Sequence, residues 1–491
     1  MNDKNTGIHR AKLWQIGCFA FNNSATNLYM FFMNFIAYYL TGMVGVGVVV
    51  ASTVITTLRI WDGVTDPFIG YLIDNTSTKF GKNRPFMLIG NIILAVASYI
   101  MLHVTHLLPT GGRFIFFVII YMIYIIGYTF QCVVTKSAQT CLTNDPKQRP
   151  LFTIFDGIYN TILFAAVPIL VSSVLVPRAG GFNEQFFHEM WMIVAPISFV
   201  FTLIAIFAIA PKDRPEYFGM GKAEKVQLKD YWEVLKGNKA MQMLIVSAST
   251  DKLAMNTQTN STVGIIIFGI VCGNYALSGA VSAYTSIPTM LILMFGAGYI
   301  ATRMGQRQAM LFGTIGGLIC SILMVVLFYM GDPTTLAFPG YDGFTGWNFF
   351  TLSFIVLYVL MKGFTGVSGN IVIPMTADCA DYEVYRSGKY VPGLMGTLFS
   401  FVDKLISSLS ATIVGMMCAF IGFSEQLPTV DTPYSDTLKF VGLFCMFGLP
   451  IFGLICNVIA MKFYPLTKEK MESIQEEIAA TKARCMEEAS A

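Results

Sequence analysis

The chain has 491 residues, of which 55% are hydrophobic and 12% are charged. Soluble globular domains carry about 25% charged residues, so this composition excludes an ordinary soluble protein. The apolar residues also gather in long runs, such as 114–130 and 440–463. A helix that crosses a bilayer needs roughly 17 to 25 of them. The formal net charge of +3 says little about partners. We therefore predict an all-α integral membrane protein that binds no nucleic acid.

Apolar segments separated by turn and charge signals predict the membrane-spanning helices. They number twelve, at 14–40, 44–74, 86–108, 114–140, 151–176, 189–211, 241–270, 278–301, 308–330, 349–376, 393–421 and 437–463. Lysine and arginine concentrate in the loops on one side of this arrangement, and the loops on the other side hold only Arg113 and Arg178. Because positive loops stay in the cytoplasm, both termini are expected to be cytoplasmic.

The most polar stretch between two expected spans lies in the middle of the chain, at 212–240. It separates an N-terminal six-helix bundle, 1–211, from a C-terminal six-helix bundle, 241–464. The polar segment 465–491 is expected to form a cytoplasmic tail helix. Two related six-helix halves are typical of secondary transporters.

The two halves carry a similar short pattern at the end of their second spans. In the first half, Asp74 is followed by a glycine and basic turn at 81–84. In the second half, Thr302 is followed by a similar turn at 303–307. The basic residues of these turns are expected to cap helix carbonyls and to meet lipid phosphates. The repetition supports an arrangement in pseudo-symmetric halves.

Two acidic residues lie inside the second expected span, in the stretch WDGVTDP at 61–67. Asp62 and Asp66 are four residues apart, so both carboxylates lie on one helix face. Two such carboxylates repel each other in a low dielectric, and a monovalent cation or a proton relieves the repulsion. Thr65 adds a hydroxyl oxygen beside them. The pattern predicts a site for a coupling cation, and the alternative is a structural clamp in which Arg59 pairs with the acids and one of them is protonated.

Charged side chains recur inside other expected spans. With those of the second span included, the charged residues are Arg59, Lys136, Lys252, Lys362, Lys404, Asp62, Asp66, Asp156, Asp251 and Asp403. A charge at bilayer depth is costly and usually faces a cavity or a partner. The balance of five cations and five anions indicates internal pairing around a polar substrate pathway, with purely structural ion pairs as the alternative.

Two stretches of the chain resemble a known transporter family. RIWDGVTDPFIGYLIDNTSTKFGKNRP at 59–85 and ADCADYEVY at 377–385 are similar to motifs of the glycoside–pentoside–hexuronide:cation symporter family, within the major facilitator superfamily. The resemblance covers essentially the whole chain. It implies the major facilitator fold, a bacterial inner-membrane location and cation-coupled sugar uptake by alternating access.

The resemblance also implies a cation site and a sugar site. The cation site would comprise Asp62, Asp66, Thr65 and Thr129, with Na⁺ or H⁺ as the coupling ion and no other metal or cofactor. Positions of the family's sugar site correspond to Asn23, Cys132, Lys136, Asp156, Ser400 and Lys404. An acid and a base of that site have exchanged sign, as Lys136 and Asp156, which argues against a neutral galactoside.

The substrate is expected to be a small glycoside or sugar acid. Lysine acts as a point charge for anions, so Lys136, Lys362 and Lys404 together favour a substrate that carries a uronate. Tyr128 is a candidate for stacking against a sugar ring. Charges in the loops after the second and tenth spans are expected to form ion pairs that close the inner side, with ordinary solvated loop charge as the alternative; they are Asp74, Arg84, Asp378, Asp381 and Glu383. Arg59 is expected to form an ion pair within the second span.

The sequence disfavours an enzyme. An enzyme would need a nucleophile, a metal cluster or a cofactor motif, and the HExxH, GxSxG and P-loop patterns are absent from the sequence. The alternatives that remain are a transporter of a lysolipid-like molecule or another organic anion, and a membrane sensor that does not transport. We expect the protein to act as a monomer in the bilayer.

Overall fold

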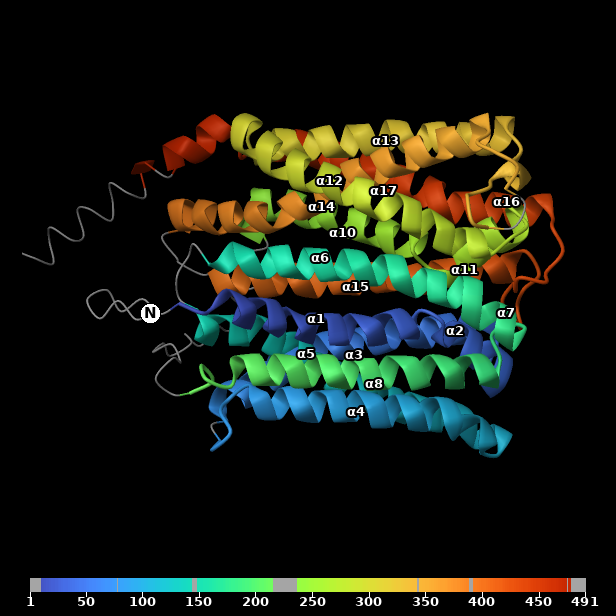
Figure 1. Cartoon of the computed structure of the whole chain (residues 1–491). Coiled ribbons are helices and arrows are strands. Elements are labelled where there is room, and N and C mark those ends of the chain that lie inside the picture. The colour runs from blue at the N-terminus through green and yellow to red at the C-terminus, as the bar shows by residue number, and fades with distance from the viewer. Residues whose placement is uncertain are drawn as a thin grey trace, which may run out of the picture. The chain divides into compact units, whose positions relative to one another are not determined.

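The chain is almost entirely helical (Figure 1). The computed structural model describes residues 10–76, 78–143, 148–214, 236–341, 344–387, 392–474 and 476–477. The chain divides into two compact units. Unit 1 comprises Met1–Lys222, Phe268–Ala283 and Ala411–Pro433, and unit 2 comprises Ala223–Ile267, Tyr284–Ser410 and Tyr434–Ala491. The expected bundles at 1–211 and 241–464 remain a prediction.

Unit 1 is built around long helices that run alongside one another (Figure 1). They are α1 (Leu13–Met33), α3 (Val48–Asn75), α4 (Arg84–His103), α5 (Thr110–Leu142), α6 (Arg149–Leu170) and α8 (Glu184–Ile209). Helix α1 packs against α6 and α8, helix α4 packs against α5 and α8, and helix α3 packs against α5. Apolar side chains from these helices, including Phe19, Ile69, Met87 and Val134, form a buried core. This core holds α3 and α5 in contact, which positions the acidic motif of α3.

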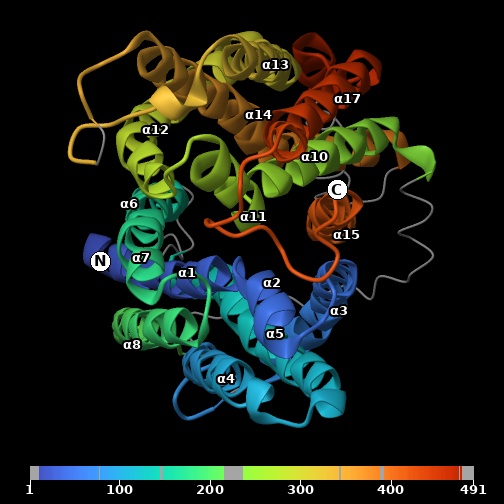
Figure 2. The ribbon, with the colours of Figure 1, turned by 90° about the vertical axis from the view of Figure 1, so that its right-hand side faces the viewer.

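Unit 2 has its own buried core, which includes Leu244, Met310, Ile371 and Met461. Its main helices are α10 (Lys239–Gln258), α13 (Gln306–Met330), α14 (Phe349–Ser387) and α17 (Leu449–Phe463). Helix α13 packs against α14 and α17, and helix α10 packs against α17 and α14. The end-on view of Figure 2 shows these four helices next to one another. Helices α12 (Ala276–Met304) and α15 (Pro392–Phe420) contribute residues to both units.

Ten helical stretches of the described residues are long and apolar enough to cross a membrane. They are Val48–Ile73, Arg84–Leu107, Thr110–Gln139, Ile154–Ala179, Glu184–Ile209, Ala276–Leu293, Gln306–Met330, Phe349–Glu383, Val402–Phe420 and Asp436–Phe463. Each of them overlaps an expected span. Large apolar side chains such as Phe68, Phe207 and Phe420 are exposed on them, as lipid contact requires.

Two expected spans, 14–40 and 241–270, fall outside this set of ten, although they contain α1 and α10. Both helices carry polar side chains that are buried inside their units, among them Asn22 on α1 and Ser247 on α10. A helix that hides polar groups in a bundle is less apolar overall than a helix surrounded by lipid. Their crossing of the membrane, the total of twelve spans and the cytoplasmic termini therefore remain predictions.

The expected tail helix lies partly within the described residues. Residues 468–474 are helical, and 478–491 lie outside the described part of the chain.

Candidate cation and substrate sites

The acidic motif lies on α3, on the side that packs against α5. Asp62 and Thr65 are buried, with 3% and 6% of their surfaces exposed, and Asp66 is half-buried one turn further along. Thr65 Oγ1 donates a hydrogen bond of 3.0 Å to the backbone carbonyl oxygen of Asp62. This bond stays within one helical turn, so it fixes the hydroxyl oxygen beside the acid.

Helix α5 brings Thr129 to the same place. Its Oγ1 donates to Asp62 Oδ1 at 3.2 Å and also lies 3.2 Å from Thr65 Oγ1. Three of the four residues that the sequence assigned to a cation site thus lie together, and they contribute oxygen atoms from two helices. Carboxylate and hydroxyl oxygens are hard ligands, which suit small alkali cations and protons.

A small cavity adjoins Asp62. Its volume is about 20 Å³, and it is lined by Met30, Met33, Arg59, Asp62, Tyr121, Tyr124, Ile125 and Tyr128. A cavity of this size holds about one water-sized guest. Arg59 interacts electrostatically with Asp62 from the same lining. Tyr124 is buried, and its hydroxyl has no hydrogen-bond partner. The lining therefore combines the charged groups of Asp62 and Arg59 with three tyrosines and with the apolar side chains of Met30, Met33 and Ile125.

The expected sugar-site residues of unit 1 lie on α1, α5 and α6. Asn23 of α1 interacts with Asp156 of α6. One turn further along the same two helices, Asn27 Nδ2 donates to Asn160 Oδ1 at 2.7 Å. Asp156 Oδ1 is buried and has no hydrogen-bond partner in the part of the chain that the structure describes. Polar side chains of α1 and α6 therefore contact one another at two successive turns.

Helix α5 carries the other expected sugar-site residues of unit 1. Tyr128 lines the small cavity and interacts with Cys132, one turn along the helix. Lys136, a further turn along, is exposed. No ion pair between Lys136 and Asp156 occurs within the described residues, so the sign exchange seen in the sequence does not form a direct salt bridge there.

The expected sugar-site residues of unit 2 lie on α14 and α15. Lys362 Nζ donates to Gln258 Oε1 of α10 at 2.5 Å and lies 5.7 Å from the centre of the Tyr358 ring. Lys404 is half-buried and interacts electrostatically with Asp403. The side chain of Ser400 lies outside the described residues.

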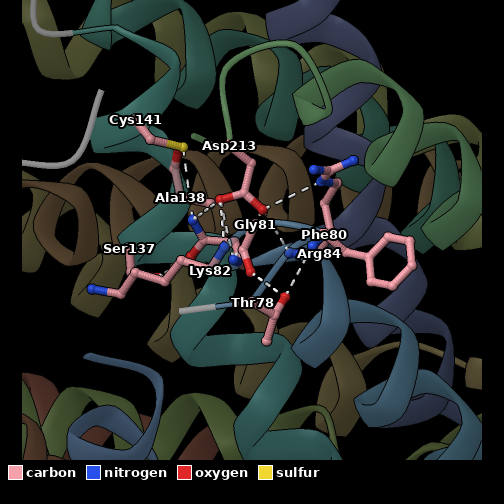
Figure 3. Close-up of polar contacts among 10 residues, drawn as sticks. Thr78, Phe80, Gly81, Lys82, Arg84, Ser137, Ala138, Cys141 and Asp213 are labelled. Carbon is pink, nitrogen blue, oxygen red and sulfur yellow. Dashed lines mark hydrogen bonds and ion pairs between the residues drawn. The ribbon is translucent and has the colours of Figure 1, made fainter. Parts of the chain in front are cut away.

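At the start of α4, Arg84 pairs with Asp213, a residue that the sequence did not single out. Asp213 follows α8 and is 1% exposed. Its carboxylate accepts hydrogen bonds of 3.0 to 3.2 Å from the backbone N–H groups of Lys82, Asn83 and Arg84, and Asn83 Nδ2 adds another at 3.0 Å (Figure 3). A helix N-terminus presents free N–H groups and a positive dipole, so it favours an anion. Asp213 therefore connects the turn between α3 and α4 to the end of α8.

Unit 2 contains a similar connection, in which an arginine donates hydrogen bonds to backbone carbonyl oxygens. Arg307, at the start of α13, donates from Nε to Met461 O at 2.9 Å and from Nη2 to Lys462 O at 3.3 Å. These carbonyls belong to the end of α17. The glycines of the two turns, Gly81 and Gly305, have φ angles of +102° and +85°. The repeat in the sequence thus corresponds to a repeat in structure, and Arg307 caps helix carbonyls as expected.

The remaining expected ion-pair residues lie on α14 and α3. Glu383 is buried; Arg386 binds its Oε1 at 2.7 Å, and Asn238 Nδ2 donates to its Oε2 at 3.0 Å. Asp378 and Asp381 are half-buried neighbours on the same helix. The side chain of Asp74 lies outside the described residues.

Comparisons with known proteins agree with this architecture. A family model described as MFS/sugar transport protein matches residues 18–468. The glucuronide carrier protein homolog of Escherichia coli (strain K12) is 23% identical over 453 residues, which cover 90% of each chain. The isoprimeverose transporter of Lactiplantibacillus pentosus is 23% identical, over 88% of this chain and 84% of the relative. The putative glycoside/cation symporter YagG of Escherichia coli (strain K12) is 23% identical, over 92% and 91%.

A solved structure shares the fold. The crystal structure of a mutant of the nucleoside transporter NupG superimposes with a TM-score of 0.61, at 14% sequence identity. The match covers 92% of this chain and 100% of that one. At this identity the likeness shows the fold alone.

Proposed function

The chain belongs to the MFS/sugar transport family, and we propose that it is a secondary symporter that imports a glycoside or sugar acid with Na⁺ or H⁺ by alternating access. It is a multi-pass membrane transporter and not an enzyme. Its named relatives are sugar or glycoside transporters. The coupling to a cation and the class of sugar are the parts that we propose.

The observation that carries the proposal is the oxygen cluster at Asp62. Asp62 Oδ1, Thr65 Oγ1 and Thr129 Oγ1 meet beside a cavity of about 20 Å³, with Asp66 on the same helix. The buried carboxylate provides charge, and the hydroxyls provide hard ligands without further charge. Such a set can replace the hydration shell of a small monovalent cation or hold a proton.

The charge balance supports a mobile cation as well. Arg59 contributes one positive charge beside the carboxylate of Asp62, and the carboxylate of Asp66 lies one turn further along α3. Binding of one monovalent cation would bring the local charge to zero, which lowers the cost of burying the site in the membrane. The clamp alternative needs a permanently protonated acid to reach the same balance.

We further propose that the substrate carries a carboxylate. Lys136 and Lys362 offer positive charge in separate units, and Lys404 offers a third. Lys362 is already held at Gln258, so its ammonium group is oriented before a ligand arrives. The relative named as a glucuronide carrier homolog supports the same class of sugar.

The test is isotope uptake into proteoliposomes across a panel of neutral glycosides and uronides, with Na⁺ and pH varied independently. We expect uphill accumulation of a uronide that depends on one of the two cations. Asp62→Asn should abolish ion-dependent accumulation and preserve folding. Asp332→Asn serves as the matched control, because this exposed acid caps the turn at Pro333–Thr335. Ion-dependent accumulation that persists in Asp62→Asn contradicts the cation site.

A further inference from the structure

Unit 2 contains a carboxylate that the proposed cation and sugar sites do not use. Asp251 lies twelve residues into α10, roughly 18 Å along the helix axis. Its Oδ2 atom accepts a hydrogen bond from Asn457 Nδ2 of α17 at 3.0 Å and contacts Ser368 Oγ of α14 at 3.2 Å. Both partners are fully buried. Three helices therefore converge on one acidic group.

The close approach of α17 to α10 depends on Gly453, one turn before Asn457. A Cβ atom at this position would lie 2.9 Å from the carbonyl oxygen of Thr250, the residue before Asp251. That distance is shorter than a carbon–oxygen contact allows, so only glycine permits this packing without a shift. The packing brings the Asn457 amide into hydrogen-bond range of Asp251.

The two oxygen–oxygen distances at Ser368 favour a proton on Asp251. A serine hydroxyl has one hydrogen to donate. Ser368 Oγ lies 2.8 Å from the Thr365 carbonyl oxygen and 3.2 Å from Asp251 Oδ2, so the shorter bond to Thr365 is the better use of that hydrogen. Ser368 Oγ then faces Asp251 as an acceptor, and two acceptors at this distance repel unless a proton lies between them. A protonated Asp251 supplies it.

Asn457 offers a second acceptor for the same proton. Its Nδ2 donates to Asp251, while its Oδ1 is buried and has no hydrogen-bond partner among the described residues. An unsatisfied buried acceptor is costly. A carboxylic acid and an amide can form a two-way pair, in which the acid O–H donates to the amide oxygen and the amide N–H donates to the acid. Neutral Asp251 has one proton, which it can donate to Ser368 or, after rotation of either group, to Asn457 Oδ1, whereas a carboxylate has no hydrogen for either acceptor.

The surrounding charges do not stabilise an ionised Asp251. The basic residues on α10, α14 and α17 are Lys239, Lys252, Lys362, Arg386 and Lys462, and within the described residues none forms an ion pair with it. Lys362 binds Gln258, and Arg386 binds Glu383. Lys252, the next residue along the chain, interacts instead with Asp403 of α15.

Other titratable groups on these helices are no better placed. The acids Asp378, Asp381 and Glu383 of α14 lie ten or more residues beyond Ser368, and the thiol of Cys456 precedes Asn457 in the chain. None of them forms a hydrogen bond with Asp251 within the described residues. Burial in a low dielectric without a neighbouring cation favours the neutral form of an acid.

We propose that Asp251, Asn457 and Ser368 form a proton-binding site in unit 2, distinct from the site at Asp62, and that Asp251 binds and releases a proton during transport. This proposal rests on the proposed symport, to which it adds a proton. The step is a simple protonation: one H⁺ from the aqueous phase joins the carboxylate, and the same H⁺ leaves on the other side.

Infrared spectroscopy of the full-length protein in lipid vesicles tests the site without any substrate. Wild-type protein at neutral pH should show the carbonyl band of a protonated carboxyl group, and this contribution should disappear in Asp251→Asn. Asp403→Asn is the matched control, because Asp403 interacts with Lys252 and Lys404 and its change should leave the band in place. Identical spectra for wild type and Asp251→Asn would overturn the proposal.

If Asp251→Asn does not fold, Ser368→Ala provides a second test of the protonation of Asp251. Ser368→Ala retains the acid and removes the acceptor for its proton, so the carboxyl band should shift in frequency. An unshifted band in a folded Ser368→Ala protein also counts against the site.

Transport assays test whether Asp251 binds and releases a proton during transport. In Asp251→Asn, accumulation driven by a pH gradient should fall about tenfold, within the range of measured couplings between sites. Exchange of labelled for unlabelled substrate, which needs no net proton movement, should continue. Wild-type accumulation with wild-type pH dependence in Asp251→Asn would refute the proton role. If none of the sugars is transported, the proposed function fails, and the infrared result still decides the protonation of Asp251.

Discussion

Asp213 and Arg84 form a partly buried ion pair at the first turn of α4, with Nε 3.4 Å from Oδ2. The Asp213 side chain is fully buried, and 23% of the Arg84 side chain is exposed. The same carboxylate also accepts backbone hydrogen bonds from this turn. The partner residues lie about 130 positions apart in the chain. This one acid therefore links the turn between α3 and α4 to the end of α8.

We predict that Asp213→Ala destabilises the protein by about 3 kcal/mol, the usual cost of removing one member of a buried charge pair. The loss arises because the N–H groups of the α4 terminus and the Arg84 guanidinium lose their acceptor together. Thermal unfolding in detergent measures it. Lys79→Ala, at an exposed position of the same turn, is the control and should change stability by less than about 0.5 kcal/mol. Equal stability of the two variants would show that Asp213 is not an anchor.

We predict that Gly81→Ala damages the same contact. Gly81 has a φ of +102°, and an added Cβ atom would overlap the Asp213 carboxylate. The substitution therefore combines backbone strain with displacement of the acid. Since both changes act on one interaction, the double variant with Asp213→Ala should lose less stability than the sum of the two single losses. Strictly additive losses, measured by unfolding, would mean that Gly81 and Asp213 act separately.

Functional residues could be predicted from the sequence where their partners lie nearby in the chain, and not where their partners lie far away. Asp62 and Asp66 could be identified because both lie in one apolar segment, where a charge stands out and its helical spacing is known. Asp213 could not, because it lies in a polar stretch where an aspartate is common and its partners are far away in the chain. Asn457 is 206 positions from Asp251, and no local pattern joins them.

The helices themselves were easier to predict than their contacts. Long apolar runs are a local property, so the ten membrane-crossing stretches overlap expected spans. Helices α1 and α10 were expected as spans, and their polar content keeps them below the hydropathy of the others. Thr129 entered the candidate cation site through the family resemblance, since a threonine 67 positions from Asp62 carries no signal of its own.

We predict that Thr129→Val weakens binding of the coupling cation about tenfold, as losses of supporting ligands commonly do. Valine preserves the shape of threonine and removes the hydroxyl that donates to Asp62. The cation dependence of substrate uptake in proteoliposomes measures the change. Thr161→Val is the matched control, because Thr161 Oγ1 is exposed and bonds to its own helix at Gly157. A cation dependence that matches the control would remove Thr129 from the site.

We predict that Arg59→Gln strengthens cation binding by about tenfold, because it removes a positive charge from the lining of the cavity beside Asp62. The structural clamp makes the opposite prediction, since the acids would lose their fixed partner and the cation would not replace it. Cation titration of uptake, or of protein stability against heating, distinguishes the two. Weaker or absent cation dependence in a folded Arg59→Gln protein supports the clamp.

The last prediction concerns the charge of the substrate. Lys362 is held by Gln258 and lies over the Tyr358 ring, so its ammonium group is positioned within unit 2. A charge-assisted hydrogen bond to a carboxylate contributes roughly 1.5 to 3 kcal/mol, so Lys362→Gln should raise the KM for a uronide by about 10- to 100-fold. A neutral glycoside lacks this interaction, and its KM should change little. Lys439→Gln is the matched control. Lys439 belongs to α16 (Asp436–Leu443) and also lies over a tyrosine ring, that of Tyr329, but it is not one of the proposed sugar-site residues. If Lys362→Gln affects neutral and acidic sugars equally, the lysine does not select for the uronate, and the substrate is better sought among neutral glycosides.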